Sequence, residues 1–211
     1  MGVIINPRGT SGAGKTELVR RIMALYRTRT GSDVAPVYRE GRERPICYRL
    51  RHPLGGRPLA VLGHYEVTSG GCDTIGGVDE AFWLASQHAA RGHDVLFEGL
   101  AISREVDRSA ALAEVHGLHI LHLGTPLEEC IRNVVRRRRA RRDTRPLISK
   151  IVAAEHEKVA DACRRLRSCA AVEAVSFDQA LLRAQELLGF GRHDLVAPCP
   201  ALIRGERRSA C

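Results

Sequence analysis

The fold is decided by one stretch near the N-terminus, Gly9-Thr10-Ser11-Gly12-Ala13-Gly14-Lys15-Thr16. It matches G-x-x-x-x-G-K-[ST], a loop whose glycines let backbone N–H groups turn toward phosphate oxygens. The apolar run Gly2–Asn6 before it predicts a strand, and the apolar spacing over Glu17–Tyr26 after it predicts a helix. Because strand, glycine loop and helix form the context that this motif needs, the sequence predicts a site for a nucleoside triphosphate.

Specific roles follow for the residues of this loop. All eight are expected to bind ATP, with the partial positive charge of the helix N-terminus behind them. Lys15 is expected to reach the β- and γ-phosphates and to take part in catalysis, and Thr16 is expected to ligate Mg²⁺. ATP and Mg²⁺ are therefore the cofactors that the sequence predicts.

The composition limits the classes of protein to consider. The 211 residues, 44% of them hydrophobic, suffice for one α/β domain with a full core. Neither a membrane span nor a signal peptide is expected, because apolar runs are short and the first strand leads directly into the loop. Seven cysteines without a CxxC pair argue against a zinc site and favour free thiols in a reducing cytoplasm. The net charge of +9 permits a polyanionic partner such as nucleic acid.

Apolar runs alternate with amphipathic segments along the rest of the chain. This alternation predicts an α/β fold, a P-loop NTPase with a mostly parallel sheet flanked by helices. Further strands are expected over Ile46–Arg51, Leu59–Tyr65, Asp94–Phe97, Gly117–Leu123 and Ala171–Val175. Helices are expected over Val78–Arg91, Leu147–Arg167, Asp178–Leu188 and from Pro126 onward, the last capped by Thr125.

The turn at residues 53–57 predicts that the second and third strands form a hairpin. Residues 1–190 are expected to form one domain, with an arginine-rich lid around residues 126–150. Residues 191–211 lack any periodicity and are expected to form a poorly ordered basic tail.

Two acidic residues are candidates for the chemistry. Glu98 follows the strand Asp94–Phe97 in a Walker-B-like pattern, and ligands gather at the carboxyl ends of strands in such sheets. Glu98 is expected to hold Mg²⁺ or its waters, or to accept a proton from the attacking hydroxyl; the alternative is an ordinary surface acid. Asp73 lies in the glycine-rich stretch Ser69–Gly77, where it could orient or deprotonate an acceptor hydroxyl, or simply cap the loop. His64 and Tyr65 are expected to line the same cleft, with a structural role as the alternative for His64.

A basic cluster follows the fifth predicted strand: Arg132, Arg136, Arg137, Arg138, Arg139, Arg141 and Arg142. Guanidinium groups bind phosphate oxygens in a planar fork, so these residues are expected to form a lid over ATP. Adjacent arginines cannot all face one way on a helix, so two or three of them are expected to contribute to the lid. Arg136 and Arg138 are expected to act on the transferring phosphoryl group and Arg137 to bind ATP. Contact with a DNA backbone, or a solvated charge run, are the alternatives.

Asp107-Arg108 is a weaker candidate. This pair lies after the strand that carries Glu98 and could grip the phosphate or base of an acceptor. A surface ion pair on a helix is the alternative.

The loop at residues 9–16, Glu98, Asp107-Arg108-Ser109 and the arginine-rich helix after Thr125-Pro126 resemble the nucleoside-monophosphate-kinase-like group of P-loop kinases. More narrowly, three short strings are similar to the small phage kinases that act on 5-hydroxymethyluracil in DNA: Gly63-His64-Tyr65, Gly70-Gly71-Cys72-Asp73-Thr74-Ile75 and Phe97-Glu98-Gly99-Leu100. The resemblance implies transfer of the γ-phosphate of ATP to the hydroxymethyl group of the base, a step in thymidine hypermodification. It also implies that Asp73 or Glu98 faces that hydroxyl, that the basic surface holds DNA, and that the protein works in the host cytoplasm.

A DNA acceptor imposes a further requirement. A stacked base cannot reach a P-loop, so the substrate must be single-stranded or the base must be extruded. Tyr65, Phe82 and Trp83 are the candidates for stacking on it. Two other functions remain open, a kinase of free nucleosides or nucleoside monophosphates and a non-catalytic, NTP-gated nucleic-acid binder. Steep salt dependence would favour DNA as the acceptor. The sequence leaves the oligomeric state open.

Overall fold

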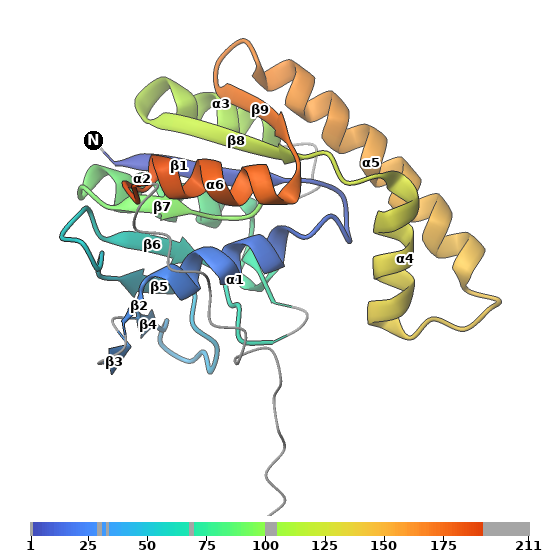
Figure 1. The fold of residues 1–211 in the computed structure, drawn as a ribbon, viewed down its shortest axis with the longest axis horizontal. Helices are drawn as coiled ribbons and strands as arrows, with labels where there is room; N and C mark the ends of the chain where they lie inside the picture. The colour runs from blue at the N-terminus through green and yellow to red at the C-terminus, as the bar shows by residue number, and fades with distance from the viewer. Residues whose placement is uncertain (1, 29–30, 33, 68–69, 100–104, 192–211) are drawn as a thin grey trace, which may run out of the picture.

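A seven-stranded sheet forms the centre of the molecule, in the order β4-β5-β6-β7-β1-β8-β9 (Figure 1). The computed structural model describes residues 2–28, 31–32, 34–67, 70–99 and 105–191. The strands from β6 to β9 run parallel, whereas β4 and β5, and β5 and β6, pair antiparallel. The strands are β1 (Val3–Arg8), β4 (Val34–Val37), β5 (Cys47–Leu50), β6 (Leu59–Leu62), β7 (Asp94–Leu96), β8 (Gly117–Leu123) and β9 (Ala171–Val175), with β2 (Arg27–Thr28) and β3 (Gly31–Ser32) in a separate ribbon.

Helices cover both faces of the sheet (Figure 1). One core, which contains Ile5, lies under α1 (Lys15–Leu25) and α6 (Phe177–Leu187). The other, which contains Ile4, lies under α2 (Val78–Ala90), α3 (Glu105–Val115) and the second half of α5 (Arg145–Leu166). Adjacent residues of β1 thus belong to opposite cores, because a central parallel strand is buried on both faces. The helix α4 (Leu127–Arg138) and the first turns of α5 project beyond the sheet (Figure 1).

The predicted α/β fold with a mostly parallel sheet is confirmed, as is the hairpin of β5 and β6. The predicted strands and helices are present, two strands with the predicted bounds and the others with ends shifted by at most three residues. The sequence did not reveal β4, because the strand is short and contains Pro36, a residue found on sheet edges where its missing N–H costs nothing. Apart from Gly191, the expected tail lies outside the described residues.

The expected cap of α4 is wrong. Pro126, with extended backbone, occupies the N-cap position, and no side chain caps the helix. The Thr125 hydroxyl instead donates to the Ala13 carbonyl oxygen at 3.0 Å. The hydroxyl is thus used to join α4 to the glycine loop rather than to begin the helix.

Within the described part of the chain, no helix is long and apolar enough to cross a membrane. The cysteines described there are free thiols, four of them buried, namely Cys47, Cys72, Cys130 and Cys163, and one exposed, Cys169.

His88 on α2 lies in the apolar layer between sheet and helix. Its Nε2 atom is 3.7 Å from the Cys47 sulfur, and its ring meets that of His93 edge-on at 5.4 Å between centroids. Burial, with further contributions from His93 and two arginines, lowers the pKa of His88 to about 4. The folded protein therefore holds this imidazole neutral at pH values where an unfolded chain would protonate it.

This difference predicts acid sensitivity. Between pH 6.5 and 4 the unfolded chain binds a proton at His88 that the folded chain does not, so the stability present above pH 6.5 is lost as the pH falls. At pH 5 the contribution of this one group is about 2 kcal/mol. Urea unfolding of the wild type and His88→Gln at pH 7.5 and 5 should show a smaller pH difference for the variant. Equal differences would contradict the assignment.

Candidate active site

Three neighbouring strands deliver the candidate residues to one edge of the sheet. β6, β7 and β1 are adjacent and parallel, so their carboxyl ends meet. β1 leads into the loop at residues 9–16, β7 is followed by Phe97 and Glu98, and β6 is followed by Gly63 and His64. This edge is where a ligand of such a sheet is expected to bind.

Two glycines of the loop at residues 9–16 are required by its shape. Gly12 and Gly14 have φ values of 87° and 101°, in the left-handed region that favours glycine. A Cβ on Gly12 would collide with the Cys130 carbonyl oxygen of α4, and one on Gly14 would lie 3.1 Å from the Phe177 ring. The loop therefore has α4 on one side and the start of α6 on the other.

The α4–α5 pair holds the loop by side-chain hydrogen bonds. Asn133 Nδ2 donates to the Gly12 carbonyl oxygen at 3.0 Å, beside the Thr125–Ala13 bond described above. From α5, the Glu155 carboxylate accepts from the Ser11 N–H at 2.9 Å. Because peptides are planar and trans, the Ala13 carbonyl that faces Thr125 turns the Gly14 N–H the opposite way. The loop is thus held in a shape that directs the Gly14 N–H away from α4.

The Lys15 ammonium lies over its own loop, where it donates to the Gly9 carbonyl oxygen at 2.6 Å and to that of Thr10 at 3.3 Å. These are carbonyl partners and not a carboxylate. The positive charge therefore stays available to a phosphate, at the N-terminus of α1, where partial positive charge also lies.

Glu98 is buried, with 7% of its surface exposed, at the end of β7. Both of its carboxylate oxygens lie 3.4 Å from the place that a Cβ on Gly71 would take, and Gly71 has a φ of 127°. Glycine at this position thus lets the segment at residues 70–77 approach the carboxylate closely. Glu98 is not the ordinary surface acid that was the alternative.

His64 and Tyr65 are buried within the segment that follows β6. His64 forms an antiparallel bridge with Gly71, and its Nδ1 atom is hydrogen-bonded to the Tyr48 hydroxyl at 3.0 Å. Burial raises the pKa of Tyr65, as do Cys72, whose sulfur is 3.9 Å from the hydroxyl, and Glu98. Both side chains hold the segment in shape, and for His64 this matches the structural alternative.

Burial excludes two of the three aromatic candidates for stacking on a base. Tyr65 and Phe82 are only 4% and 5% exposed, so neither can stack on a base as expected, because both fill the core. Asp73 lies in the short 3₁₀ helix Cys72–Thr74, close in sequence to Gly71, but its side chain lies outside the described residues.

The arginines at the end of α4 are exposed. Arg136 Nη2 donates to the Asn133 side-chain oxygen at 3.4 Å, and Asn133 in turn holds the Gly12 carbonyl. Arg136 is thereby connected to the glycine loop. Among the residues that the structure describes, none pairs a carboxylate with Arg136, Arg137 or Arg138.

Asp107 and Arg108 do not pair with each other. Arg108 Nε lies 2.6 Å from an Asp79 oxygen on α2, and an Asp107 oxygen lies 4.0 Å from Arg165 on α5. Both pairs are exposed, so they fit the surface alternative better than a grip on an acceptor.

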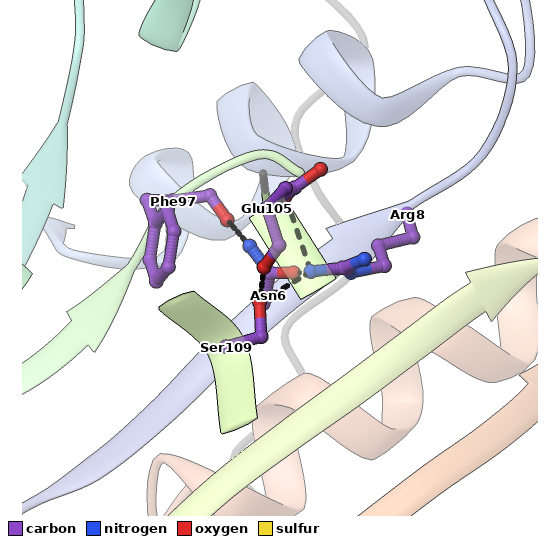
Figure 2. Close-up of polar contacts among 5 residues, drawn as sticks. All are labelled: Asn6, Arg8, Phe97, Glu105 and Ser109. Atoms are coloured by element: carbon purple, nitrogen blue, oxygen red, sulfur yellow. Dashed lines mark hydrogen bonds and ion pairs between the residues drawn. The ribbon is translucent and has the colours of Figure 1, made fainter. Parts of the chain in front are cut away.

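Sequence reasoning missed a buried polar network directly beneath the loop (Figure 2). Arg8, the last residue of β1, lies 3.1 Å from the Glu105 carboxylate, and both side chains are less than 5% exposed. Arg8 also donates to Asn6 Oδ1 at 2.8 Å and to the Ser109 hydroxyl at 2.7 Å, and Asn6 donates to the Phe97 carbonyl oxygen at 2.8 Å. The network joins β1, the residue after β7 and α3. A charged residue ending an apolar strand, Arg8, was the available signal.

The donor set suits Mg²⁺, which keeps several waters and binds through one or two protein oxygens plus substrate phosphates. The Thr16 hydroxyl, in the helix after β1, and the Glu98 carboxylate, after the neighbouring β7, are such oxygens. Groups of three or more His, Cys, Asp or Glu side chains able to hold a metal are absent from the described residues.

The mostly parallel sheet, flanked by helices, fits the fold of a P-loop kinase. No family model matches the chain. The chain is 39% identical to the 5-hmdU DNA kinase of Pseudomonas phage PaMx11 over 178 residues, which cover 83% of this chain and 90% of the relative. The chain therefore belongs to the family of 5-hmdU DNA kinases, and the narrower resemblance seen in the sequence is confirmed.

The buried network predicts a strong coupling. Glu105→Gln should lower the free energy of unfolding by about 3 kcal/mol, because Arg8 keeps a buried charge that has lost its carboxylate partner. The double variant Arg8→Met, Glu105→Met should lose less free energy of unfolding than the single variants Arg8→Met and Glu105→Met lose together, as measured by urea unfolding. Additive losses would mean that the two charges do not depend on each other.

Proposed function

We propose that this protein is a kinase that transfers the γ-phosphate of ATP to the hydroxymethyl oxygen of 5-hydroxymethyluracil in DNA. The observation that carries the proposal is the 39% identity with a 5-hmdU DNA kinase over most of both chains. The meeting of the glycine loop and buried Glu98 at one sheet edge agrees with it.

In this proposal, ATP binds along the loop from Gly9 to Thr16. Backbone N–H groups and the Lys15 ammonium meet the phosphate oxygens, and Lys15 exchanges its carbonyl partners for them. Arg137 at the end of α4 is a further candidate contact to ATP. Mg²⁺, held by Thr16 and Glu98, would neutralise charge on the phosphates.

The acceptor hydroxyl oxygen attacks the γ-phosphorus, the bond from that phosphorus to the β-phosphate oxygen breaks, and the hydroxyl proton leaves to a base. Asp73 and Glu98 are the two candidates for that base, in the segment after β6 and at the end of β7. Lys15, Arg136 and Arg138 stabilise the charge on the transferring group, as electrostatic catalysis of phosphoryl transfer requires. The connection of Arg136 through Asn133 to Gly12 favours Arg136 as the nearest of these arginines.

The exposed guanidinium groups of α4 and of the turn after it are available for DNA phosphates. They lie on a part of the molecule that projects beyond the sheet (Figure 1). Together with the net charge of +9, they are the expected contact to the DNA backbone. With Arg136, Arg137 and Arg138 assigned to ATP and to the transferring group, the remaining members of this basic surface are Arg132, Arg139, Arg141 and Arg142.

The choice of acceptor gives the most direct prediction. With labelled γ-phosphate of ATP and Mg²⁺, label should enter DNA that contains 5-hydroxymethyluracil, and should not enter plain DNA, free nucleosides or nucleoside monophosphates. Transfer should fall steeply as salt rises, because arginine contacts to phosphates release counterions. Label only on a free nucleoside or monophosphate would overturn the proposal in favour of a small-molecule kinase. Label on no acceptor would favour a non-catalytic binder.

The assigned roles predict the effects of substitutions. Lys15→Ala should lower turnover on modified DNA at least about 100-fold without changing the melting temperature, because it removes charge stabilisation from the transition state. Asp73→Asn and Glu98→Gln should each lower turnover strongly. Lys158→Ala on α5 is the matched control, since Lys158 is exposed and takes no part in the hydrogen bonds between α5 and the loop. Normal turnover by Lys15→Ala would refute the role of the loop.

A further inference from the structure

Aromatic side chains are scarce in this chain, and two thirds of them are buried. Of the nine Phe, Trp and Tyr residues, all in the described ranges, Tyr38 and Trp83 are 54% and 59% exposed. Phe177 is half-buried, and the remaining six are buried. A single exposed aromatic ring is common on protein surfaces, so its position decides whether it has a role.

Tyr38 lies at the edge of the sheet that carries the candidate site. β4 and β6 both run antiparallel to β5, so β4 runs in the direction of β6 and ends at the same edge. Tyr38 follows Val37, the last residue of β4. Tyr38 therefore stands at the edge where Glu98 and the glycine loop also lie.

Tyr38 lies near Tyr48 of β5. Pro36 pairs with Tyr48 in the register of β4 and β5, and Tyr38 follows two residues later, just after β4 ends. Burial, with smaller contributions from the nearby Glu66 and Tyr38, raises the pKa of Tyr48 to about 12, which agrees with this placement.

A short chain of contacts leads from Tyr48, the neighbour of Tyr38, toward Glu98. The Tyr48 hydroxyl holds His64, His64 bridges to Gly71, and Gly71 packs against the Glu98 carboxylate. The exposed ring of Tyr38 thus lies near the buried residues Tyr48 and His64, which hold the segment that packs against Glu98.

The residues on both sides of Tyr38 are held in place, one by its backbone and the other by its side chain. The Val37 carbonyl oxygen accepts from the Ile46 N–H at 2.9 Å, and the Arg39 guanidinium forms an ion pair with Glu80 on α2. The ring is therefore exposed on a held segment, which lowers the entropic cost of using it to bind a ligand.

We propose that Tyr38 is the platform on which the extruded pyrimidine stacks, an inference that rests on the proposed function. An extruded base loses its stacking in the duplex, and enzymes of this kind replace it with an aromatic or apolar side chain. Tyr65 and Phe82 are buried and cannot take this role. Trp83 belongs to α2, which packs on the opposite face of the sheet from Tyr48, among the second core. Tyr38 is thus a substrate-binding residue that selects a planar acceptor.

Replacement of the ring tests this proposal. Tyr38→Leu should lower kcat/KM for 5-hydroxymethyluracil DNA by about tenfold or more, the effect of losing one base–aromatic stack, with the KM for ATP unchanged. Tyr38→Phe and Tyr38→Trp keep a ring and should stay within about twofold of the wild type. Trp83→Leu, which removes the other exposed aromatic, is the matched control and should also stay within about twofold. Duplex DNA with 2-aminopurine beside the target base should brighten with the wild type and less with Tyr38→Leu, because that signal reports extrusion of the neighbour.

Each outcome separates this inference from the proposed function. A wild type that labels modified DNA, with Tyr38→Leu equally active, overturns the role of Tyr38 and leaves the proposed function standing. A loss of kcat/KM in Trp83→Leu and not in Tyr38→Leu would also overturn the role of Tyr38. So would a loss in Tyr38→Phe as large as that in Tyr38→Leu, because the hydroxyl and not the ring would then matter. A wild type that places no label on DNA overturns the proposed function, and the inference with it.

Discussion

The rest of the site depends on one buried ion pair, that of Arg8 and Glu105. A buried guanidinium is tolerated only when its charge and donors are met, and here a carboxylate, an amide oxygen and a hydroxyl meet them (Figure 2). Arg8 immediately precedes the glycine loop, and Glu105 opens α3, so the pair links the start of the loop to the element that follows Glu98. The loop and the acidic residue are thereby held to one another beneath the surface, where solvent does not weaken the interaction.

A second constraint acts from the side. The α4–α5 pair is docked on the loop by Asn133, Thr125 and Glu155, each of which bonds a backbone group of the loop. The arginine-rich helix is therefore attached to the glycine loop through Gly12 and Ala13. A basic surface that also meets DNA through the same helix would place the polymer and ATP on one rigid support.

Much of this arrangement could be predicted from the sequence. The glycine loop and Glu98 come directly after apolar strands, and parallel strands bring their carboxyl ends together, so the meeting of these residues follows from local patterns. Other roles depended on burial, which periodicity does not reveal for single residues. The sequence suggested Tyr65 and Phe82 as rings for stacking on a base, but both fill the core. Tyr38, after the unpredicted strand β4, is exposed. Asp107 pairs with a residue of α5 and Arg108 with a residue of α2, both far away in the sequence.

The sequence by itself determined most of the strands and helices, the glycine loop and the kinship with 5-hmdU DNA kinases, since these reside in local spacing and in residue identity. The tertiary structure alone decided which charges are buried and which aromatic rings face solvent. Those outcomes depend on strand register and on contacts between residues about 100 positions apart, such as Arg8 with Glu105 and Ser109. No local pattern carries that information, because a side chain's partners are set by where the whole chain places them.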